Sequence, residues 1–96
     1  MNFIENENSL VCELPERLDT VNSQEFEGQL KKVLEKNFKT MTFDFSNVNF
    51  VSSYFLRICL NMIKQYGADN FHVINVKSEI KKVFMISGFD KIMKIK

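Results

Sequence analysis

The segment NFVSSYFLRICL, residues 49–60, decides how the second half of the chain folds. Two serines precede a run of residues that favours a helix, and the first of them has the residue type and position of an N-cap. Gly67 is a residue that commonly follows the last turn of a helix. We therefore predict a helix from about Ser52 to Tyr66 that is capped by Ser52 and ended by Gly67.

A helical wheel gives this helix two sides of different polarity. Apolar side chains gather on one broad side, which holds Phe55, Leu56, Ile58, Cys59, Met62, Ile63 and Tyr66. We expect Phe55 to point into the core for this reason. Polar positions on the other side place Ser53 and Tyr54 on an exposed first turn, beside Arg57.

The remaining segments predict strands that alternate with helices. Period-2 alternation of apolar residues, or a short apolar run between turn residues, marks the strands; these are residues 1–5, 9–14, 40–45 and 70–75, with a final edge strand at 90–96. Asn22 is the expected N-cap of a first helix, with Glu25 completing a capping box. Ser78 is the expected cap of a third helix that Gly88 ends.

Strands that alternate with helices favour crossover connections and a mostly parallel sheet, here with an antiparallel start. The fold class is therefore α/β, with four or five strands and at least three helices. The chain has 96 residues, and no linker or repeat divides it, so we expect one domain over residues 1–96.

Composition argues against several classes of function. There are 13 basic and 12 acidic residues, and this near-neutral balance gives no basic footprint for nucleic acid. The acidic residues are concentrated in the first half and the basic residues in the second, which occurs by chance in small domains or orients a protein partner. No apolar run is long enough to span a bilayer and no signal peptide is evident, so we expect no membrane insertion and a cytoplasmic protein.

Catalytic and metal-binding patterns are also missing from the sequence. Cys12 and Cys59 lie far apart, which suits two buried thiols in a reducing cytosol better than a disulfide or a metal site. His72 is the only histidine, and the three glycines form no phosphate-binding loop. We therefore expect neither enzymatic activity nor a cofactor.

The serines at the helix start have a chemical use besides capping. Unpaired N–H groups at a helix N-terminus stabilise an anion, and phosphate on a serine there adds a charge of roughly −1.5 to −2 at neutral pH. A hydroxyl on this turn thus suits a reversible charge change that a partner senses. The alternative is that Ser52 caps the helix and does nothing else, a contribution of about 1 kcal/mol.

The segment FDFSNVNFVSSYFLRICL, residues 43–60, resembles the core motif of STAS domains, the family of anti-sigma factor antagonists. That motif reads Asp-Leu-Ser-Gly-Val, an aromatic, then Ile-Ser-Ser-Ala-Gly-Leu-Arg or Asp-Ser-Ser/Thr-Gly-Leu-Gly before a helix. PERLDTVNSQEF resembles the family's turn into its first helix, with Asp19 at the acidic position. SEIKKVFMISGFDKIMKI resembles its closing helix and last strand. The resemblance covers almost the whole chain in order.

The resemblance implies a small cytosolic switch. Such a protein binds an anti-sigma factor or a serine kinase of the histidine-kinase ATPase type, and so frees a sigma factor. Phosphorylation at the start of the second helix blocks binding, and a PP2C-type phosphatase restores it. Carried over to this chain, the resemblance implies Ser53 and Ser52 as candidate phosphoacceptors, Asp19 as their support, and an interface that includes Thr20, Tyr54, Phe55 and Arg57.

The match to the motif is incomplete at three positions, the first of which is Ser52, where the family has an acidic residue ahead of the acceptor. Tyr54 stands at the usual acceptor position, and Phe55 stands where the family has glycine. Three interpretations remain open: Ser53 is the acceptor, shifted by one place; the site is not phosphorylated and the antagonist is always active; or the domain is a phosphorylation-independent scaffold or transporter accessory. For Asp19 the alternative to a role at the acceptor is that its carboxylate caps the first helix.

Overall fold

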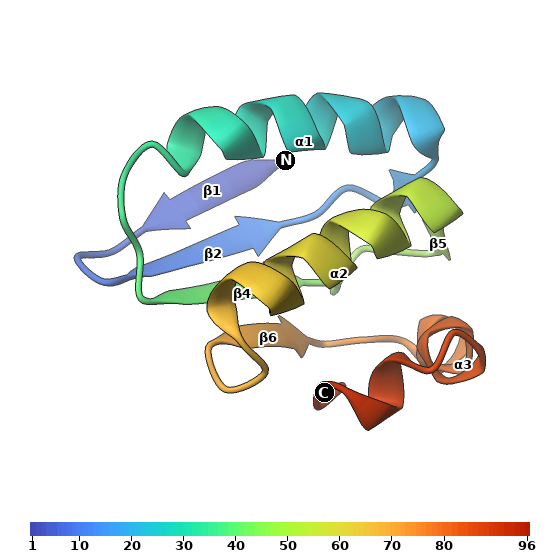
Figure 1. The fold of residues 1–96 in the computed structure, drawn as a ribbon. Coiled ribbons are helices and arrows are strands. Elements are labelled where there is room, and N and C mark those ends of the chain that lie inside the picture. The colour runs from blue at the N-terminus through green and yellow to red at the C-terminus, as the bar shows by residue number, and fades with distance from the viewer.

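The computed structural model describes residues 1–96 as alternating strands and helices (Figure 1). The elements, in chain order, are β1 (Asn2–Glu5), β2 (Ser9–Glu13), β3 (Arg17–Leu18), α1 (Thr20–Val33), β4 (Thr40–Asp44), β5 (Phe50–Val51), α2 (Ser53–Tyr66), β6 (Phe71–Ile74) and α3 (Ser78–Ile86), followed by a short 3-10 helix (Phe89–Lys91). The predicted strands at residues 1–5, 9–14, 40–45 and 70–75 are confirmed, as is the second helix.

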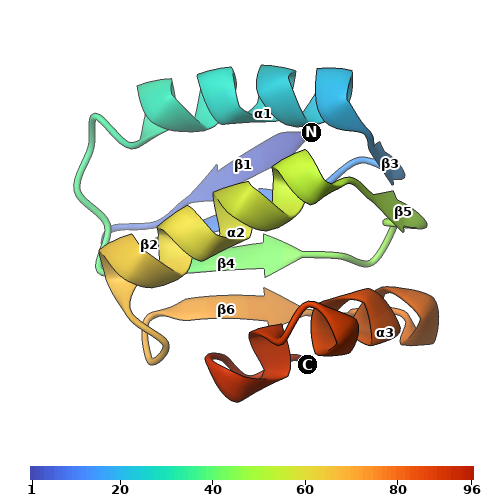
Figure 2. The same ribbon diagram turned by 45° about the vertical axis from the view of Figure 1, so that its right-hand side comes forward.

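The main sheet has the strand order β1-β2-β4-β6. β1 is antiparallel to β2, whereas β2, β4 and β6 are parallel, which confirms a mixed, mostly parallel α/β sheet. The crossovers through α1 and α2 both proceed in the same direction along the sheet. As a result, both helices cover the same face, as the two views show (Figures 1 and 2).

Aromatic side chains fill the layer between this face and the helices. The ring centroid of Phe43, from β4, lies 5.4 Å from that of Phe26 on α1 and 5.7 Å from that of Phe55 on α2. Phe71, from β6, completes the cluster with its centroid 5.0 Å from Phe43. All four side chains are fully buried or nearly so. Period-2 alternation in β4 and the apolar sides of the helices produce this core.

A second, two-stranded sheet, which the sequence analysis missed, joins the starts of α1 and α2. β3 and β5 are parallel, with Arg17 opposite Phe50 and Leu18 opposite Val51. Each strand has only two residues, so neither shows a periodic pattern in the sequence. This pairing brings together the two segments that lead into the helices, on which the candidate site depends.

Side chains after β4 and β6 fix the loop that enters β5. The Asp44 carboxylate accepts hydrogen bonds from the Ser46 amide at 3.0 Å, from the Ser46 hydroxyl, and from the Asn75 amide group at 3.1 Å. Partial burial opposes the charged form of Asp44, but these hydrogen bonds outweigh it and hold the pKa below its usual value. Asn75 adopts a φ of 58°, a left-handed conformation that asparagine tolerates better than most residues.

Three predicted element boundaries are wrong, and two of them are the starts of α1 and α3. α1 begins at Thr20 with Asp19 as its N-cap, so the capping box expected at Asn22 and Glu25 does not form. At α3, Ser78 is the first helical residue and Lys77 precedes it without a side-chain cap.

The expected final strand at residues 90–96 is replaced by the 3-10 helix and one isolated bridge, between Val73 and Ile95. Gly88 begins this turn at a φ of 80°, in the left-handed region that favours glycine, and so directs the chain away from α3.

Candidate functional site

Ser52 caps α2, as the sequence predicts. Its backbone is extended, and its hydroxyl oxygen accepts a hydrogen bond from the Phe55 amide at 3.3 Å. Its own amide donates to the Leu18 carbonyl at 2.8 Å, which continues the pairing of β3 with β5. The residue is half-buried. Capping therefore occupies the Ser52 hydroxyl in the folded chain.

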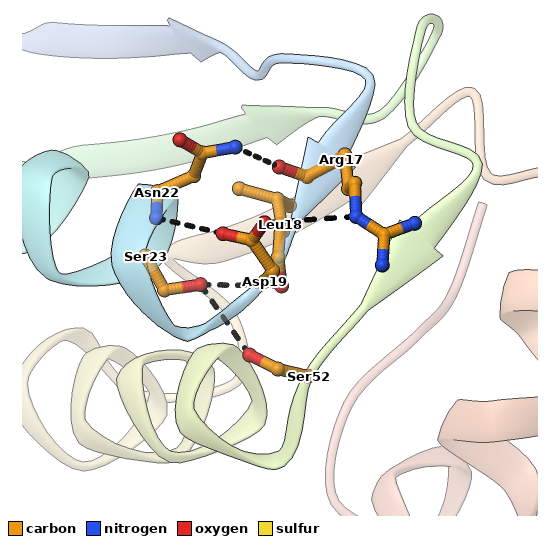
Figure 3. A network of polar contacts seen from close by, with 6 residues as sticks. All are labelled: Arg17, Leu18, Asp19, Asn22, Ser23 and Ser52. Atoms are coloured by element: carbon orange, nitrogen blue, oxygen red, sulfur yellow. Dashed lines mark hydrogen bonds and ion pairs between the residues drawn. The ribbon is translucent and has the colours of Figure 1, made fainter.

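A buried hydroxyl links this cap to the start of α1. Ser23 is fully buried, and its hydroxyl donates to the Leu18 carbonyl at 3.3 Å while lying 3.5 Å from the hydroxyl of Ser52 (Figure 3). A polar side chain without exposure is stable only when it has such partners. Ser23 thus joins the first turns of the two helices through one small group.

The Asp19 carboxylate caps α1. One oxygen accepts a hydrogen bond from the Asn22 amide at 2.9 Å, and the other lies 3.6 Å from the Arg17 Nε (Figure 3). The side-chain amide of Asn22 donates in turn to the Arg17 carbonyl at 2.8 Å. Of the two roles considered for Asp19, the geometry shows the capping role, and the carboxylate makes no hydrogen bond to Ser52 or Ser53.

Ser53 is the hydroxyl that faces solvent at this site. It is exposed, and no hydrogen bond within the chain uses its side chain. The N-terminus of α2 has no acidic residue at its cap or in its first turn, so no carboxylate of α2 offsets the positive end of that helix dipole, whereas Asp19 serves this role at α1. Thr20 is likewise exposed at the first position of α1. The surface suits an added negative charge at Ser53.

Tyr54 does not stand free on the first turn, contrary to the prediction. It is half-buried, and its hydroxyl donates to the Glu27 carboxylate on α1 at 2.6 Å. This hydrogen bond and the nearby negative charge raise the pKa of Tyr54. The Arg57 guanidinium, exposed as predicted, lies 5.9 Å from the centre of the tyrosine ring. The wheel misplaced Tyr54 because it describes one helix and ignores its neighbour.

Phe55 must be removed from the predicted interface. Its side chain is fully buried, with ring centroids of Phe26, Phe43 and Phe45 within 5.7–5.9 Å, so it has no surface to offer a partner. The apolar side of the wheel correctly predicted its position in the core. Phe55 supports the site from beneath instead.

Arg17 and Phe50 form an exposed pair that was not predicted. The Arg17 guanidinium lies 4.6 Å from the ring centre of Phe50, within the range of a cation–π interaction. Phe50 is 40% exposed, and Val21, on the first turn of α1, is 71% exposed. Arg17 and Phe50 are opposite each other in the β3–β5 register. No local pattern in the sequence could have paired them, because they meet only through this non-local contact.

The chain contains no group of three or more His, Cys, Asp or Glu side chains that could hold a metal ion. No helix has the length and apolar character needed to cross a bilayer. Buried as they are, both thiols have pKa values above the usual range, that of Cys12 at about 12.

The model of the STAS domain family matches residues 1–96. The chain belongs to the STAS domain family. Curated protein sequences give no match. Among solved structures, that of the anti-sigma factor antagonist SpoIIAA in its unphosphorylated form aligns with a TM-score of 0.76 and 19% sequence identity. The alignment covers 99% of this chain and 88% of that one.

In this STAS domain, the site combines a free hydroxyl at a helix start with exposed groups that come from three other elements. Ser53 is supplied by α2, Thr20 and Val21 by α1, and Arg17 and Phe50 by the paired strands β3 and β5. Together these residues form an exposed surface of apolar, cationic and hydroxyl side chains. We call these five residues the docking surface.

Proposed function

We propose that this STAS domain is an anti-sigma factor antagonist, which binds an anti-sigma factor or a serine kinase of the histidine-kinase ATPase type in the cytoplasm. Membership of the family supports the proposal, together with a fold shared with the antagonist SpoIIAA. The observation that carries it is the docking surface, where an unused serine hydroxyl stands among exposed apolar and cationic side chains.

The composition of the docking surface is typical of a protein interface. Arginine and aromatic residues are enriched at the centres of such interfaces, and Arg17 and Phe50 are already stacked on each other. Val21, four residues after Arg17 on the first turn of α1, adds exposed apolar area. Because the β3–β5 pairing holds these groups in place, binding need not first order them.

Ser53 is the phosphoacceptor that the geometry favours. The Ser53 hydroxyl makes no hydrogen bond within the chain. By contrast, the Ser52 hydroxyl caps α2 and belongs to a half-buried residue, and the Tyr54 hydroxyl donates a hydrogen bond to Glu27. Phosphate at Ser53 adds negative charge to the docking surface and so weakens binding of a partner that contacts it. A PP2C-type phosphatase would reverse the change.

Binding rather than catalysis is the proposed activity. Open α/β sheets bind small molecules in a crevice at the carboxyl ends of the strands. The crevice forms where the crossovers from two adjacent strands lead in opposite directions along the sheet. Here the crossovers from β2 to β4 and from β4 to β6 run in the same direction and cover the same face. Turnover of a nucleotide by the isolated domain would contradict this part of the proposal.

Replacement of Ser53 by aspartate tests the proposal. The partner is first captured from native cells with the wild-type domain and identified, and its affinity is then measured by titration calorimetry. We expect Ser53→Asp to weaken binding by about tenfold or more, or about 1.4 kcal/mol, while Ser53→Ala keeps it. Asn61→Asp places the same charge on an exposed position further along α2 and should leave affinity unchanged.

A phosphorylation-independent scaffold, or an accessory subunit of a transporter or signalling complex, is the second candidate. Tyr54 favours it, because the usual acceptor position carries a phenol that Glu27 holds against α1. Equal affinity of wild type and Ser53→Asp for the captured partner would favour this function over the switch.

A further inference from the structure

A second surface, formed by the end of α3 and the segment that follows it, differs in composition from the docking surface. Ile86 is 87% exposed, Met85 58% and Ile92 42%, and no other part of the chain brings three large exposed apolar residues so close in sequence. α3 and the C-terminal segment lie together on the β6 side of the sheet (Figure 2). The apolar side chains therefore stand on this side of the molecule.

Lysines surround these apolar side chains. Residues 77–96 contain six lysines and two carboxylates, so this segment carries a net charge of +4. Met85 shares a shallow hollow with two lysines and one carboxylate, and the rest of the lining is Lys81, Asp90, Met93, Lys94 and Ile95. Lys82 lies one helical turn before Ile86. We call Lys82, Met85, Ile86, Lys91 and Ile92 the α3 face.

The lysine charges are not neutralised within the chain. The two side-chain ion pairs of the structure join Arg17 to Asp19 and Lys36 to Glu5, and neither involves a residue of the α3 face. Five of the six C-terminal lysines also make no side-chain hydrogen bond, the exception being Lys77, which donates to Asn49. An anionic partner would therefore meet free ammonium groups.

The residue types on the α3 face indicate which anionic partner fits. Protein interfaces are enriched in arginine and aromatic residues and depleted in lysine. The α3 face has two lysines, two isoleucines and no arginine or aromatic residue, and Met85 is its one member of a type that protein interfaces favour. Ile86 is 87% exposed. Aliphatic side chains that enter the lipid boundary, flanked by lysines that meet anionic headgroups, are the two elements of peripheral membrane binding.

We propose that the α3 face binds the surface of an anionic lipid membrane, reversibly and without spanning it. α3 has nine residues and is far too short to cross a bilayer. Met85, Ile86 and Ile92 enter the headgroup boundary while Lys82 and Lys91 contact phosphate groups. The docking surface is formed by other residues, so this inference does not depend on the proposed function.

Vesicle co-sedimentation of the full chain tests the proposal. We expect binding to vesicles of phosphatidylglycerol mixed with phosphatidylcholine, at least about tenfold stronger than to phosphatidylcholine alone, and weakened by added salt. Ile86→Ser should reduce binding by about tenfold, because an exposed side chain that no longer enters the lipid loses its transfer energy. Val21→Ser, at an exposed apolar position on α1, is the matched control and should bind as the wild type does.

Charge-reversal variants distinguish binding through the α3 face from a general attraction of lysines to anionic lipid. The double variant Lys82→Glu with Lys91→Glu should abolish binding, whereas Lys31→Glu with Lys32→Glu, the same charge change on exposed positions of α1, should preserve it. Equal loss in both double variants overturns the proposal, and so does an absence of sedimentation at low salt. If the chain does not bind vesicles but a purified acidic protein protects the Ile86 amide from hydrogen exchange, the proposal is overturned and the α3 face is assigned to a protein partner.

Discussion

Phe55→Ala provides a quantitative test of the position assigned to this side chain. Phe55 is fully buried, and three phenyl rings lie with their centroids 5.7–5.9 Å from its own. Loss of a buried phenylalanine removes the transfer free energy of the ring and leaves a cavity, at a total cost of about 3–5 kcal/mol. A domain of this length has a free energy of unfolding of about 5–14 kcal/mol, so the variant loses a large fraction of its stability.

Urea denaturation followed by far-ultraviolet circular dichroism measures this loss. With a slope of about 2 kcal/mol per molar urea, the midpoint should fall by about 2 M. Phe50→Ala is the matched control, because it removes the same ring from a site that is 40% exposed. That variant loses its cation–π interaction with Arg17, about 0.5–1 kcal/mol, and the transfer free energy of the shielded part of its ring, but it leaves no enclosed cavity and so costs less than Phe55→Ala. A loss below about 1 kcal/mol for Phe55→Ala, or equal losses for the two variants, would refute the core assignment.

Three further outcomes follow from the contacts of individual side chains. Asp19→Ala should lower the free energy of unfolding by about 1 kcal/mol, because it removes the cap of α1, whereas Asp19→Asn should retain most of it; thermal denaturation compares the two. The pKa of Asp44 is lower in the folded chain than its unfolded value of about 3.9, so its contribution to stability is present above that pH and is lost as the pH falls through the folded pKa. Asp44→Asn should therefore flatten the acid side of a stability–pH curve, and an unchanged slope would contradict this. Cys12 and Cys59 are fully buried with raised pKa values, so a thiol reagent at neutral pH should modify neither until the chain unfolds, and rapid labelling of the native protein would count against their burial.

Local patterns in the sequence were sufficient for most of the fold. Leu10, Cys12, Met41 and Phe43 alternate with polar neighbours, and they are buried on one face of β2 and β4 because a strand turns successive side chains to opposite faces. The limits of α2 were also predictable, since a serine cap and a terminal glycine mark its ends.

Features that depend on non-local contacts were not predictable. Asp19 and Asn22 are both good capping residues, and the pairing of β3 with β5 is what selects Asp19, because it fixes where the strand ends and the helix begins. The same pairing places Arg17 against Phe50. Tyr54 was misplaced because its partner, Glu27, belongs to another helix. At the candidate site, sequence reasoning thus identified Ser52, Ser53, Asp19 and Thr20, but not Arg17, Val21 or Phe50.

The β3–β5 pairing also has a consequence for anyone seeking to imitate or block this protein. The five residues of the docking surface come from two separate stretches of chain, residues 17–21 and 50–53, and they become neighbours only when those stretches are assembled. A linear peptide copied from residues 49–60 would carry the serines without Arg17 or Val21. Useful mimics must therefore reproduce a discontinuous epitope, and antibodies raised against the unfolded chain would not recognise it.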